Sequence, residues 1–357
     1  MKKVICYLLV IVLVFTAFYG CKNKPKNKEV IKVGVILPLT GRYADGAASL
    51  KAGVSIAIEE LNAACGYEKY KYYEYDTRSD AKNAIAGYAQ LKATQNIKVF
   101  VTTYSDNSLI LKPMAIKDNN LLICVASHAD ITKDNHNLVF RSCYTSADEI
   151  DFIMSSLKDN SSNSNLLVYN SNTEAGVAYD FKLRNDYKDN ILKIVTYDED
   201  VNSVKNITAI PEVETCDNIL LLGFTPIMGT IVKSLVEYGY EGDIYANPGF
   251  NEPSALAAAG SASTRVKYID YDFPYESKEH AVRESKAEKE YKAHFSWLSY
   301  SAYLSLKVMD QCVETEGFDI ELIGKKLSEV ESYDIDGCTF KTNGQGGILP
   351  SLKLVSK

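Results

Sequence analysis

The feature that most limits the folds open to this chain of 357 residues is a repeated alternation of short apolar strands and amphipathic helices. Residues 31–38 are nearly all apolar, as a strand must be when both faces of a parallel sheet are covered. The helix expected over residues 45–64 places its apolar side chains on one face: Leu50, Val54, Ala57, Ile58 and Leu61. Repeated strand–helix units of this length imply right-handed crossovers and an open parallel sheet.

A second series of strand–helix units begins after residue 146, which indicates two lobes. A size of about 150 residues per domain leads to the same number. The extended segment VFRSCYTS lies between the two series, and we interpret it as a crossover between lobes. Near the end of the chain, CTFKT and SLKLV predict two short strands about a glycine-rich turn at residues 343–347. The expected fold class is α/β, with two doubly wound parallel-sheet lobes.

The first 20 residues are typical of an export signal. Two lysines precede an uncharged apolar segment, residues 4–19, which is shorter than the ~20 residues that span a membrane as a helix. Gly20 directly precedes Cys21, which resembles a bacterial lipobox, although Phe18 and Tyr19 replace its usual residues. We expect Cys21 to be lipidated and residues 21–30 to form a polar linker. The alternatives are a plain secreted protein and an uncleaved anchor.

Charge and motifs argue against several classes of function. The net charge of −7 argues against a nucleic-acid partner, because phosphate binding requires a basic face. The six cysteines after residue 21 form no CxxC pair and have no histidine at metal-ligand spacing, so we predict no metal site. Cys124 and Cys143 lie in apolar contexts that favour buried free thiols, while disulfide pairing stays open. No catalytic or phosphate-binding motif is present, so we expect neither an enzyme nor a cofactor.

The loop after the first strand indicates a binding cleft. In a doubly wound sheet, ligands bind beyond the carboxyl ends of the strands, in the loops that lead to the helices. The segment LTGRYADG is the first such loop, so Thr40, Gly41 and Tyr43 are expected to face a cleft between the lobes. The alternative is that Gly41 only relieves a tight turn and Tyr43 only covers the sheet edge.

A succession of segments resembles a known family. They are IKVGVILPLTGRYADGAASLKAGVSIAIEELNA, YEYDTRSDAKNAIAGYAQL, LLICVASHADIT, VFRSCYTSADE, LLLGFTPIMGTIVKSLVEYGY, SWLSYSAYLSLKVMDQCVE and YDIDGCTFKTNGQGG. In this order they resemble the type I periplasmic binding proteins. The nearest branch is the leucine/isoleucine/valine-binding and amide-binding group that serves ABC importers. The resemblance extends from residue 31 to the end of the chain.

The resemblance implies two lobes joined by three hinge crossovers. One lobe would comprise residues 31–142 and 273–336, and the other residues 143–272 and 337–357. The lobes would close on a small-molecule ligand and present it to an ABC permease in the membrane. We expect a monomer that is lipid-anchored to the outer face of the membrane, on the periplasmic side. A sensor built on the same scaffold is the alternative.

The resemblance also suggests residues that bind the carboxylate of an amino-acid ligand. A carboxylate is bound by backbone N–H groups at a helix start and by hydroxyls. The family's serine loop corresponds to Ser105, with Tyr104 and Asp106 beside it. Its second loop corresponds to Ala126 and Ser127. The alternative is that both loops only cap the helices that follow.

The expected partners of the ligand's ammonium group depart from the family. The family's tyrosine is Ala175 here, and a second aromatic position is Phe224, which has no hydroxyl. The acidic position falls near Gly249, where Asn251 and Glu252 are the nearest candidates; Glu252 is either a substitute or an exposed loop carboxylate. The expected ligand is a branched-chain amino acid or a related molecule, with an amide or a small carboxylate as alternatives.

Overall fold

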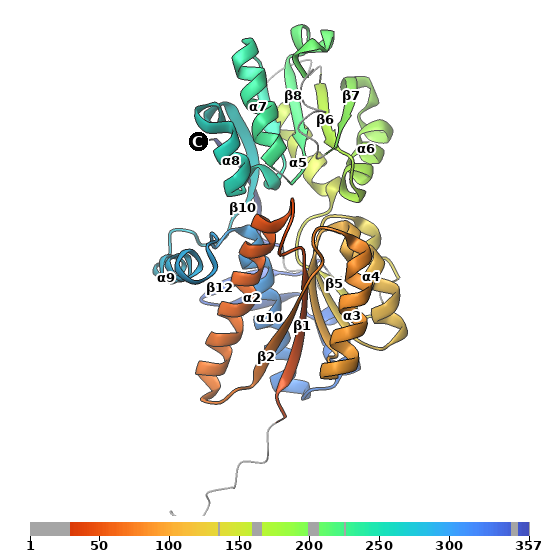
Figure 1. Ribbon diagram of the computed structural model, residues 1–357, viewed down its shortest axis with the longest axis vertical. Coiled ribbons are helices and arrows are strands. Elements are labelled where there is room, and N and C mark those ends of the chain that lie inside the picture. Colours follow the sequence, from red (N-terminus) through yellow and green to blue (C-terminus); the bar gives the residue numbers. More distant parts are fainter. Residues whose placement is uncertain are drawn as a thin grey trace, which may run out of the picture.

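The computed structural model describes residues 29–134, 136–158, 166–198, 207–224, 226–343 and 349–356. The predicted export signal, Cys21 and nearly all of the predicted linker lie outside these residues. The described chain forms two α/β lobes, one above the other in Figure 1, each built on its own sheet. This confirms the predicted fold class. None of the described helices is both long and apolar enough to span a membrane.

The first lobe contains a five-stranded parallel sheet in the order β2-β1-β3-β4-β5. Its strands are β1 (Ile31–Leu37), β2 (Tyr70–Asp76), β3 (Val99–Thr103), β4 (Leu121–Val125) and β5 (Val139–Arg141). The main helices are α2 (Ala44–Cys65), α3 (Ala81–Gln95), α4 (Ser105–Lys117) and α10 (Trp297–Glu316). The central strands β3 and β4 are buried along their whole length, because helices cover both faces of the sheet.

The second lobe contains a six-stranded sheet in the order β13-β10-β9-β8-β6-β7. Its strands are β6 (Leu166–Ser171), β7 (Ile191–Tyr197), β8 (Asn218–Leu222), β9 (Asp243–Ala246), β10 (Val266–Tyr271) and β13 (Leu352–Ser356). The helices are α5 (Ser146–Lys158), α6 (Glu174–Asp186), α7 (Pro226–Tyr238) and α8 (Pro253–Ala259). Alternate residues of β6 enter two separate apolar clusters, Leu167 in one and Val168 in the other, so both faces of this sheet are covered too.

The chain passes between the lobes after β5, after β10 and before β13. On its return to the first lobe it forms α9 (Lys278–Lys286), a π-helical turn (Ala287–Tyr291), α10, α11 (Ile320–Glu329) and a hairpin of β11 (Ser332–Ile335) and β12 (Cys338–Lys341). Short 3₁₀ turns occupy Ala129–Ile131, Lys188–Asn190, Ile207–Ala209, Pro211–Glu214, Pro248–Asn251 and Gly260–Arg265. The three connections give the two lobes the freedom to move as units.

Side-chain caps and one close contact fix the helices that border the cleft. The Asp80 side chain accepts a hydrogen bond from the backbone of α3, and Ser296 does the same for α10. In the middle of α2, a Cβ on Gly53 would lie 2.1 Å from the Ser299 carbonyl oxygen. The absence of a side chain at this position therefore permits α2 and α10 to pack closely.

The two C-terminal strands predicted about the glycine-rich turn do not pair with each other, and nearly all of that predicted turn lies outside the described residues. The CTFKT segment forms β12 and pairs with β11, whereas SLKLV forms β13 and pairs antiparallel with β10 in the other lobe. The predicted lobe boundary between Asp336 and Gly337 falls inside the turn of the β11–β12 hairpin, and Phe340 packs in the core of the first lobe. The sequence shows where a strand is apolar, but it does not show which strand will be its partner.

The six cysteines of the described chain are free. Cys124 and Cys143 are fully buried, as predicted, and burial raises the pKa of both thiols. A thiol held in its neutral form is a poor nucleophile and a poor metal ligand. These two cysteines therefore act as small apolar side chains.

Candidate functional site

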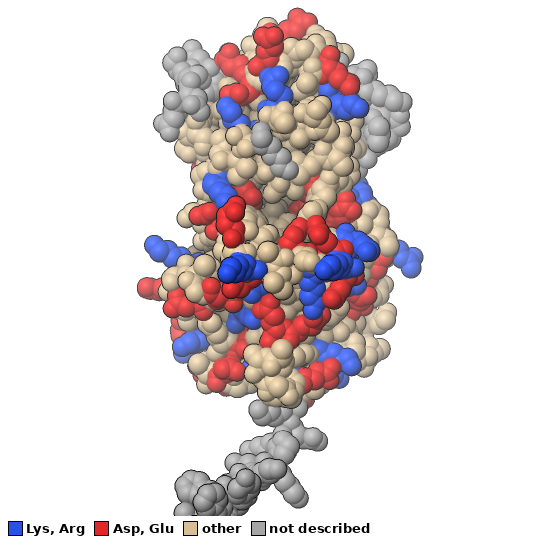
Figure 2. Space-filling model, turned by 90° about the vertical axis from the view of Figure 1, so that its left-hand side faces the viewer, with Lys and Arg blue, Asp and Glu red and all other residues tan. Residues whose placement is uncertain are grey.

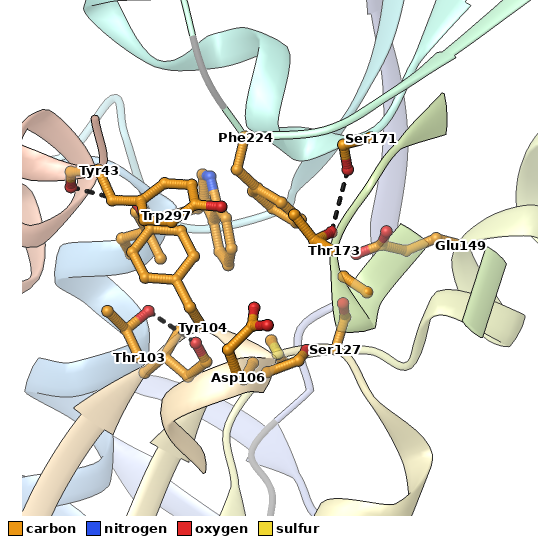
Figure 3. A pocket seen from close by; sticks show the side chains of 16 residues that line it. Tyr43, Thr103, Tyr104, Asp106, Ser127, Glu149, Ser171, Thr173, Phe224 and Trp297 are labelled. Atoms are coloured by element: carbon orange, nitrogen blue, oxygen red, sulfur yellow. Dashed lines mark hydrogen bonds between the residues drawn. The ribbon is translucent and has the colours of Figure 1, made fainter. Parts of the chain in front are cut away.

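A pocket lies between the two lobes (Figure 3). About 510 Å³ inside it is free of atoms, but the centres of water molecules fit into only about 20 Å³ of that space. The walls of the pocket are therefore close together. The lining residues are Tyr43, Thr103, Tyr104, Ser105, Asp106, Val125, Ala126, Ser127, Cys143, Glu149, Ser171, Thr173, Ala175, Phe224, Trp297 and Leu298.

The pocket forms where strands end and helices begin. The first lobe contributes the ends of β3 and β4 and the first turn of α4. The second lobe contributes the end of β6, the start of α6 and the loop after β8. Trp297 and Leu298, the first residues of α10, complete the wall. Backbone N–H groups at the starts of helices favour negatively charged or polar ligand groups at this position.

Two buried donors in the pocket wall have no hydrogen-bond partner among the described residues. Ser105 and Trp297 are each only 3 % exposed, and neither the Ser105 Oγ nor the Trp297 Nε1 is bonded. Leaving a buried polar group without a partner costs about 1–3 kcal/mol, so such groups call for an explanation. Both line the same pocket. A ligand carrying acceptor atoms would satisfy them.

Tyr104 adopts a backbone conformation that is rare for its residue type. Its φ of 64° lies in the left-handed region, where a bulky side chain is strained. The conformation is held by hydrogen bonds from the Tyr104 N–H to the Val125 carbonyl (3.3 Å) and from the Ser108 N–H to the Tyr104 carbonyl (3.0 Å). Strain of this kind, which costs about 1–3 kcal/mol, concentrates at binding and catalytic sites. Here it directs the Tyr104 ring into the cleft.

Aromatic rings from both lobes form the apolar part of the pocket. The Tyr43 and Tyr104 rings stack with centroids 4.4 Å apart. Across the cleft, the Phe224 ring meets Tyr104 edge to face at 6.2 Å. The Trp297 ring stacks on the Tyr271 ring of the second lobe, with the ring centroids 5.1 Å apart and the ring planes 8° from parallel. The geometry therefore provides flat apolar surfaces for the body of a ligand.

Glu149, in the first turn of α5, is the buried carboxyl of the pocket. It is 1 % exposed and accepts a hydrogen bond from the Tyr179 hydroxyl. Burial raises the pKa of Glu149 to about 8, the nearby Asp148 adds to this effect, and the Tyr179 bond opposes it. The carboxyl is therefore mostly protonated at neutral pH.

The charged groups of the pocket wall are all acidic. Asp106 and Glu149 line it, and no lysine, arginine or histidine is among the described residues that line it. A ligand anion would therefore depend on N–H and O–H donors, because no cationic side chain is there to pair with it. A ligand cation would meet carboxyl groups.

A wider groove opens onto the pocket from the solvent side. The two share Tyr43, Tyr104 and Asp106, and the groove holds about 690 Å³ of water-accessible space. Arg42, Lys82 and Glu174 add charge to its walls. Figure 2 shows the molecule narrowed between its lobes, with charged side chains along the rim of the waist. This groove is the natural approach to the pocket.

Comparison of the sequence with protein families gives one match. The family described as periplasmic binding protein matches residues 30–346. The chain belongs to this family. The resemblance noted in the sequence is confirmed, and a search of curated proteins gives no significant match.

Solved structures share the fold of this periplasmic binding protein. LivJ of Streptococcus pneumoniae, a branched-chain amino acid transporter substrate-binding protein in complex with isoleucine, has 17% identity and a TM-score of 0.79 and covers 92% of this chain and 96% of its own. The leucine-binding protein LivK of Thermotoga maritima has 19% identity and a TM-score of 0.80, and the match covers 91% of this chain and 95% of LivK. A solute-binding protein of R. palustris in complex with benzoate has 16% identity and a TM-score of 0.77, and the match covers 92% of this chain and 93% of the R. palustris protein.

The pocket brings together most of the ligand residues predicted for this periplasmic binding protein: Tyr43, Tyr104, Ser105, Asp106, Ala126, Ser127 and Phe224. Thr40 and Gly41 do not line it; the Thr40 hydroxyl instead donates to Asp76 (2.7 Å) at the edge of the sheet. Gly41 has a φ of 89° and allows the turn, which agrees with the alternative reading of that residue.

The other two predicted residues, Asn251 and Glu252, lie outside the pocket lining. The Asn251 side chain donates to Asp270 over 3.4 Å. Glu252 is 3 % exposed, and its carboxylate oxygens have no hydrogen-bond partner in the described chain. The alternative that Glu252 is an exposed loop carboxylate is therefore wrong. Burial raises its pKa to about 8, with repulsion from Asp45 and Asp270 in addition.

Several lining residues were not identified from the sequence. Trp297, the first residue of α10, is one of them. Thr103 and Val125 end buried strands, so the rule that ligands bind beyond strand ends was a usable signal for them. Glu149, by contrast, is one of three acidic residues in ADEID, and nothing in that pattern separates it from an exposed helix face.

One group of side chains away from the pocket has the composition of a metal site. Ligand atoms of Glu284, Glu288 and His294 lie within 4.8 Å of one another near the π-helical turn. Glu288 and His294 are exposed, and the Glu284 carboxylate already accepts a hydrogen bond from the Phe295 N–H (2.5 Å). Exposed acidic groups of this kind are common without a metal.

Proposed function

We propose that this periplasmic binding protein is the substrate-binding subunit of an ABC importer. It takes a small amino-acid-like solute into the pocket between its lobes and delivers it to permease subunits in the membrane. A branched-chain amino acid or a close relative is the preferred ligand, and an amide or a small carboxylate is the second choice. The protein itself catalyses no reaction.

The observation that carries this proposal is the pair of unsatisfied donors in the interlobe pocket. The Ser105 hydroxyl stands at the start of α4, where backbone N–H groups add to it. The Trp297 indole N–H lies in the same wall. A ligand carboxylate supplies the acceptors that these groups lack, and the helix dipole favours its charge.

The ligands of two structural relatives support the same chemistry. The S. pneumoniae protein holds isoleucine, and the R. palustris protein holds benzoate. Each molecule joins a carboxylate to an apolar body. The pocket described here offers donors at α4 and aromatic walls at Tyr43, Tyr104 and Phe224. It therefore suits a ligand with both parts.

Lipidation at Cys21 remains part of the proposal, although Cys21 lies outside the described residues. The lipid would hold a monomeric binding protein at the outer face of the membrane, on the periplasmic side. The polar linker would then allow the folded lobes to reach the permease.

A thermal-shift screen with amino acids, amides and small carboxylates tests the proposal. A ligand at 100 times its dissociation constant stabilises the folded protein by ~2.7 kcal/mol, which gives a clear rise in melting temperature. We expect branched-chain amino acids to give the largest rise. A rise with amides alone would change the ligand class, and no rise with any member of the panel would contradict the proposal.

A further inference from the structure

Glu149, which lines the pocket, stands at the end of a chain of hydrogen bonds. The Asn247 side-chain N–H donates to the Tyr179 hydroxyl over 3.2 Å, and the Tyr179 hydroxyl donates to Glu149. Ser127 of the first lobe also hydrogen-bonds with Tyr179. Each donor in such a chain polarises the next, so the chain favours an acceptor at its end. Glu149 is thus placed to be stabilised as a carboxylate.

No positively charged side chain balances Glu149 in the described structure. Among the described residues, Glu149 makes no ion pair, and those that line the pocket include no lysine, arginine or histidine. Burial without a cation keeps the group protonated, as its raised pKa of about 8 indicates. The arrangement is therefore incomplete: donors are in place for an anion, while the positive partner of that anion is missing.

We propose that Glu149 receives the cationic ammonium group of the ligand and that its own proton leaves to solvent when the ligand binds. The inference rests on the proposed function, because it names the partner of a ligand in that same pocket. The proton balance is simple. The neutral carboxyl loses one proton to water and becomes a carboxylate, and the ligand keeps its ammonium proton and donates a charge-assisted hydrogen bond.

The surroundings of Glu149 favour it over the other acidic candidates. Asp106 lies at the mouth of the pocket, where it also borders the solvent-filled groove. Glu252 is buried but does not line the pocket. The titratable groups that influence Glu149 or are influenced by it are Asp148 on its own helix, Cys143 on the crossover, Tyr179 on α6 and Tyr271 on β10. At neutral pH the thiol and the two phenols are uncharged, because burial raises the pKa of each.

The release of a proton makes binding depend on pH in a defined direction. Below a pKa of about 8 the free protein holds the proton that the ligand must expel, so affinity for an ammonium ligand rises with pH. The rise approaches tenfold per pH unit, and it levels off near pH 8. Ligands without an ammonium group do not expel the proton and lack this dependence.

Isothermal titration calorimetry in buffers of different ionisation enthalpy measures the proton directly. The probes are L-leucine, L-leucinamide, which keeps the ammonium but has no carboxylate, and isocaproate, which keeps the carboxylate but has no ammonium. At pH 7 we expect leucine to release about 0.9 proton per ligand and leucinamide about 0.8, because roughly a tenth of the free leucinamide amine is neutral and takes up a proton on binding. We expect isocaproate to release none.

Two variants assign the proton to a residue. Glu149→Gln should abolish proton release and weaken leucine binding at least tenfold, while Glu252→Gln, which alters an equally buried carboxyl, should leave the release intact. Leucine binding without proton release would overturn the inference and leave the proposed function standing. Release that is lost in Glu252→Gln but kept in Glu149→Gln would also overturn it. Failure of all three probes to bind would overturn the inference together with the proposed ligand class.

Discussion

At the scale of single residues, two buried serines of α4 are predicted to have different roles, one in ligand binding and the other in the stability of the fold. Ser105 lines the pocket, and its hydroxyl has no partner in the part of the chain that the structure describes, whereas the buried Ser108 donates to the Tyr104 carbonyl over 2.8 Å. We predict that Ser105→Ala weakens ligand binding by ~1–3 kcal/mol and leaves the free protein at least as stable. Ser108→Ala should instead lower stability by ~1 kcal/mol with little effect on binding.

Chemical denaturation and ligand titration of both serine variants check this pair. The prediction depends on opposite outcomes for two buried hydroxyls in one helix. Equal losses of affinity, or a loss of stability in Ser105→Ala larger than in Ser108→Ala, would mean that the Ser105 hydroxyl serves the fold and not the ligand.

Glu252 makes the stability of the protein fall as pH rises. Its pKa is about 8 in the folded protein and 4.5 in its reference state, so folding favours the protonated form. The stability it contributes is complete below pH 4.5 and is lost as pH rises to about 8, by about 1.4 kcal/mol per unit. Glu252→Gln should remove the contribution of Glu252 to the pH dependence of stability. The variant should therefore be more stable than the parent protein at pH 8.

Denaturant titrations of the parent and the Glu252→Gln variant between pH 5 and 8, about one per pH unit, give the slope of the free energy of unfolding against pH for each protein. Glu149 contributes a slope of the same sign to the ligand-free protein, so the variant keeps part of it. Identical slopes in the two proteins would show that Glu252 is not held protonated by burial.

At the scale of helices and strands, the packing of α2 against α10 depends on Gly53. Alanine has the higher helix propensity, by about 1 kcal/mol, so propensity alone predicts that Gly53→Ala stabilises the protein. A Cβ at this position would lie 2.1 Å from the Ser299 carbonyl oxygen, which forces the helices apart. We therefore predict a net loss of ~1–3 kcal/mol in the free energy of unfolding, measured by denaturant titration. A stabilised variant would contradict the packing described.

The elements that the sequence predicted well are those with a strong local pattern. The apolar run of β1 and the apolar repeat of α2 are visible within a single segment, although residues 52–58 of α2 are buried on every side and not on one face only. Pairing is not local: β13 joins β10, which lies some 80 residues earlier in the chain. The helix α9 passes into a π-helical turn at Ala287–Tyr291, and no apolar period in the sequence indicates this change. The errors therefore concern partners and helix irregularities.

The candidate site divides in the same way. Tyr43 is predicted because it lies in a loop that follows a recognisable strand, whereas Ser105 and Ser127 are predicted from the family resemblance; all three line the pocket. Glu149 and Trp297 come from helices whose approach to the cleft depends on how the two lobes meet. Sequence periodicity records which face of a helix is buried, but it does not distinguish burial in a core from burial at a cleft. The site residues whose position depends on how the lobes meet could therefore be identified only from the structure.

At the scale of the whole molecule, attachment to the membrane is predicted to depend on one side chain. We expect Cys21→Ser to move the protein from the membrane fraction to the soluble fraction of the cell envelope, because the thiol that would carry the lipid is gone. The folded lobes begin well after this position, so ligand binding should be unchanged. Cell fractionation followed by immunoblotting measures the shift, and a variant that stays in the membrane would exclude a lipid anchor at Cys21.

Closure of the two lobes on a ligand is the central claim, and the chain contains its own reporter. Trp297 is the single tryptophan, it is buried in the pocket wall, and its indole N–H has no hydrogen-bond partner among the described residues. Titration of its fluorescence with L-leucine and other members of the ligand panel follows the pocket directly. We predict a saturable change in emission for every ligand that raises the melting temperature, at a concentration that increases in Ser105→Ala. A ligand that stabilises the protein but leaves the Trp297 emission unchanged binds elsewhere and would contradict the account.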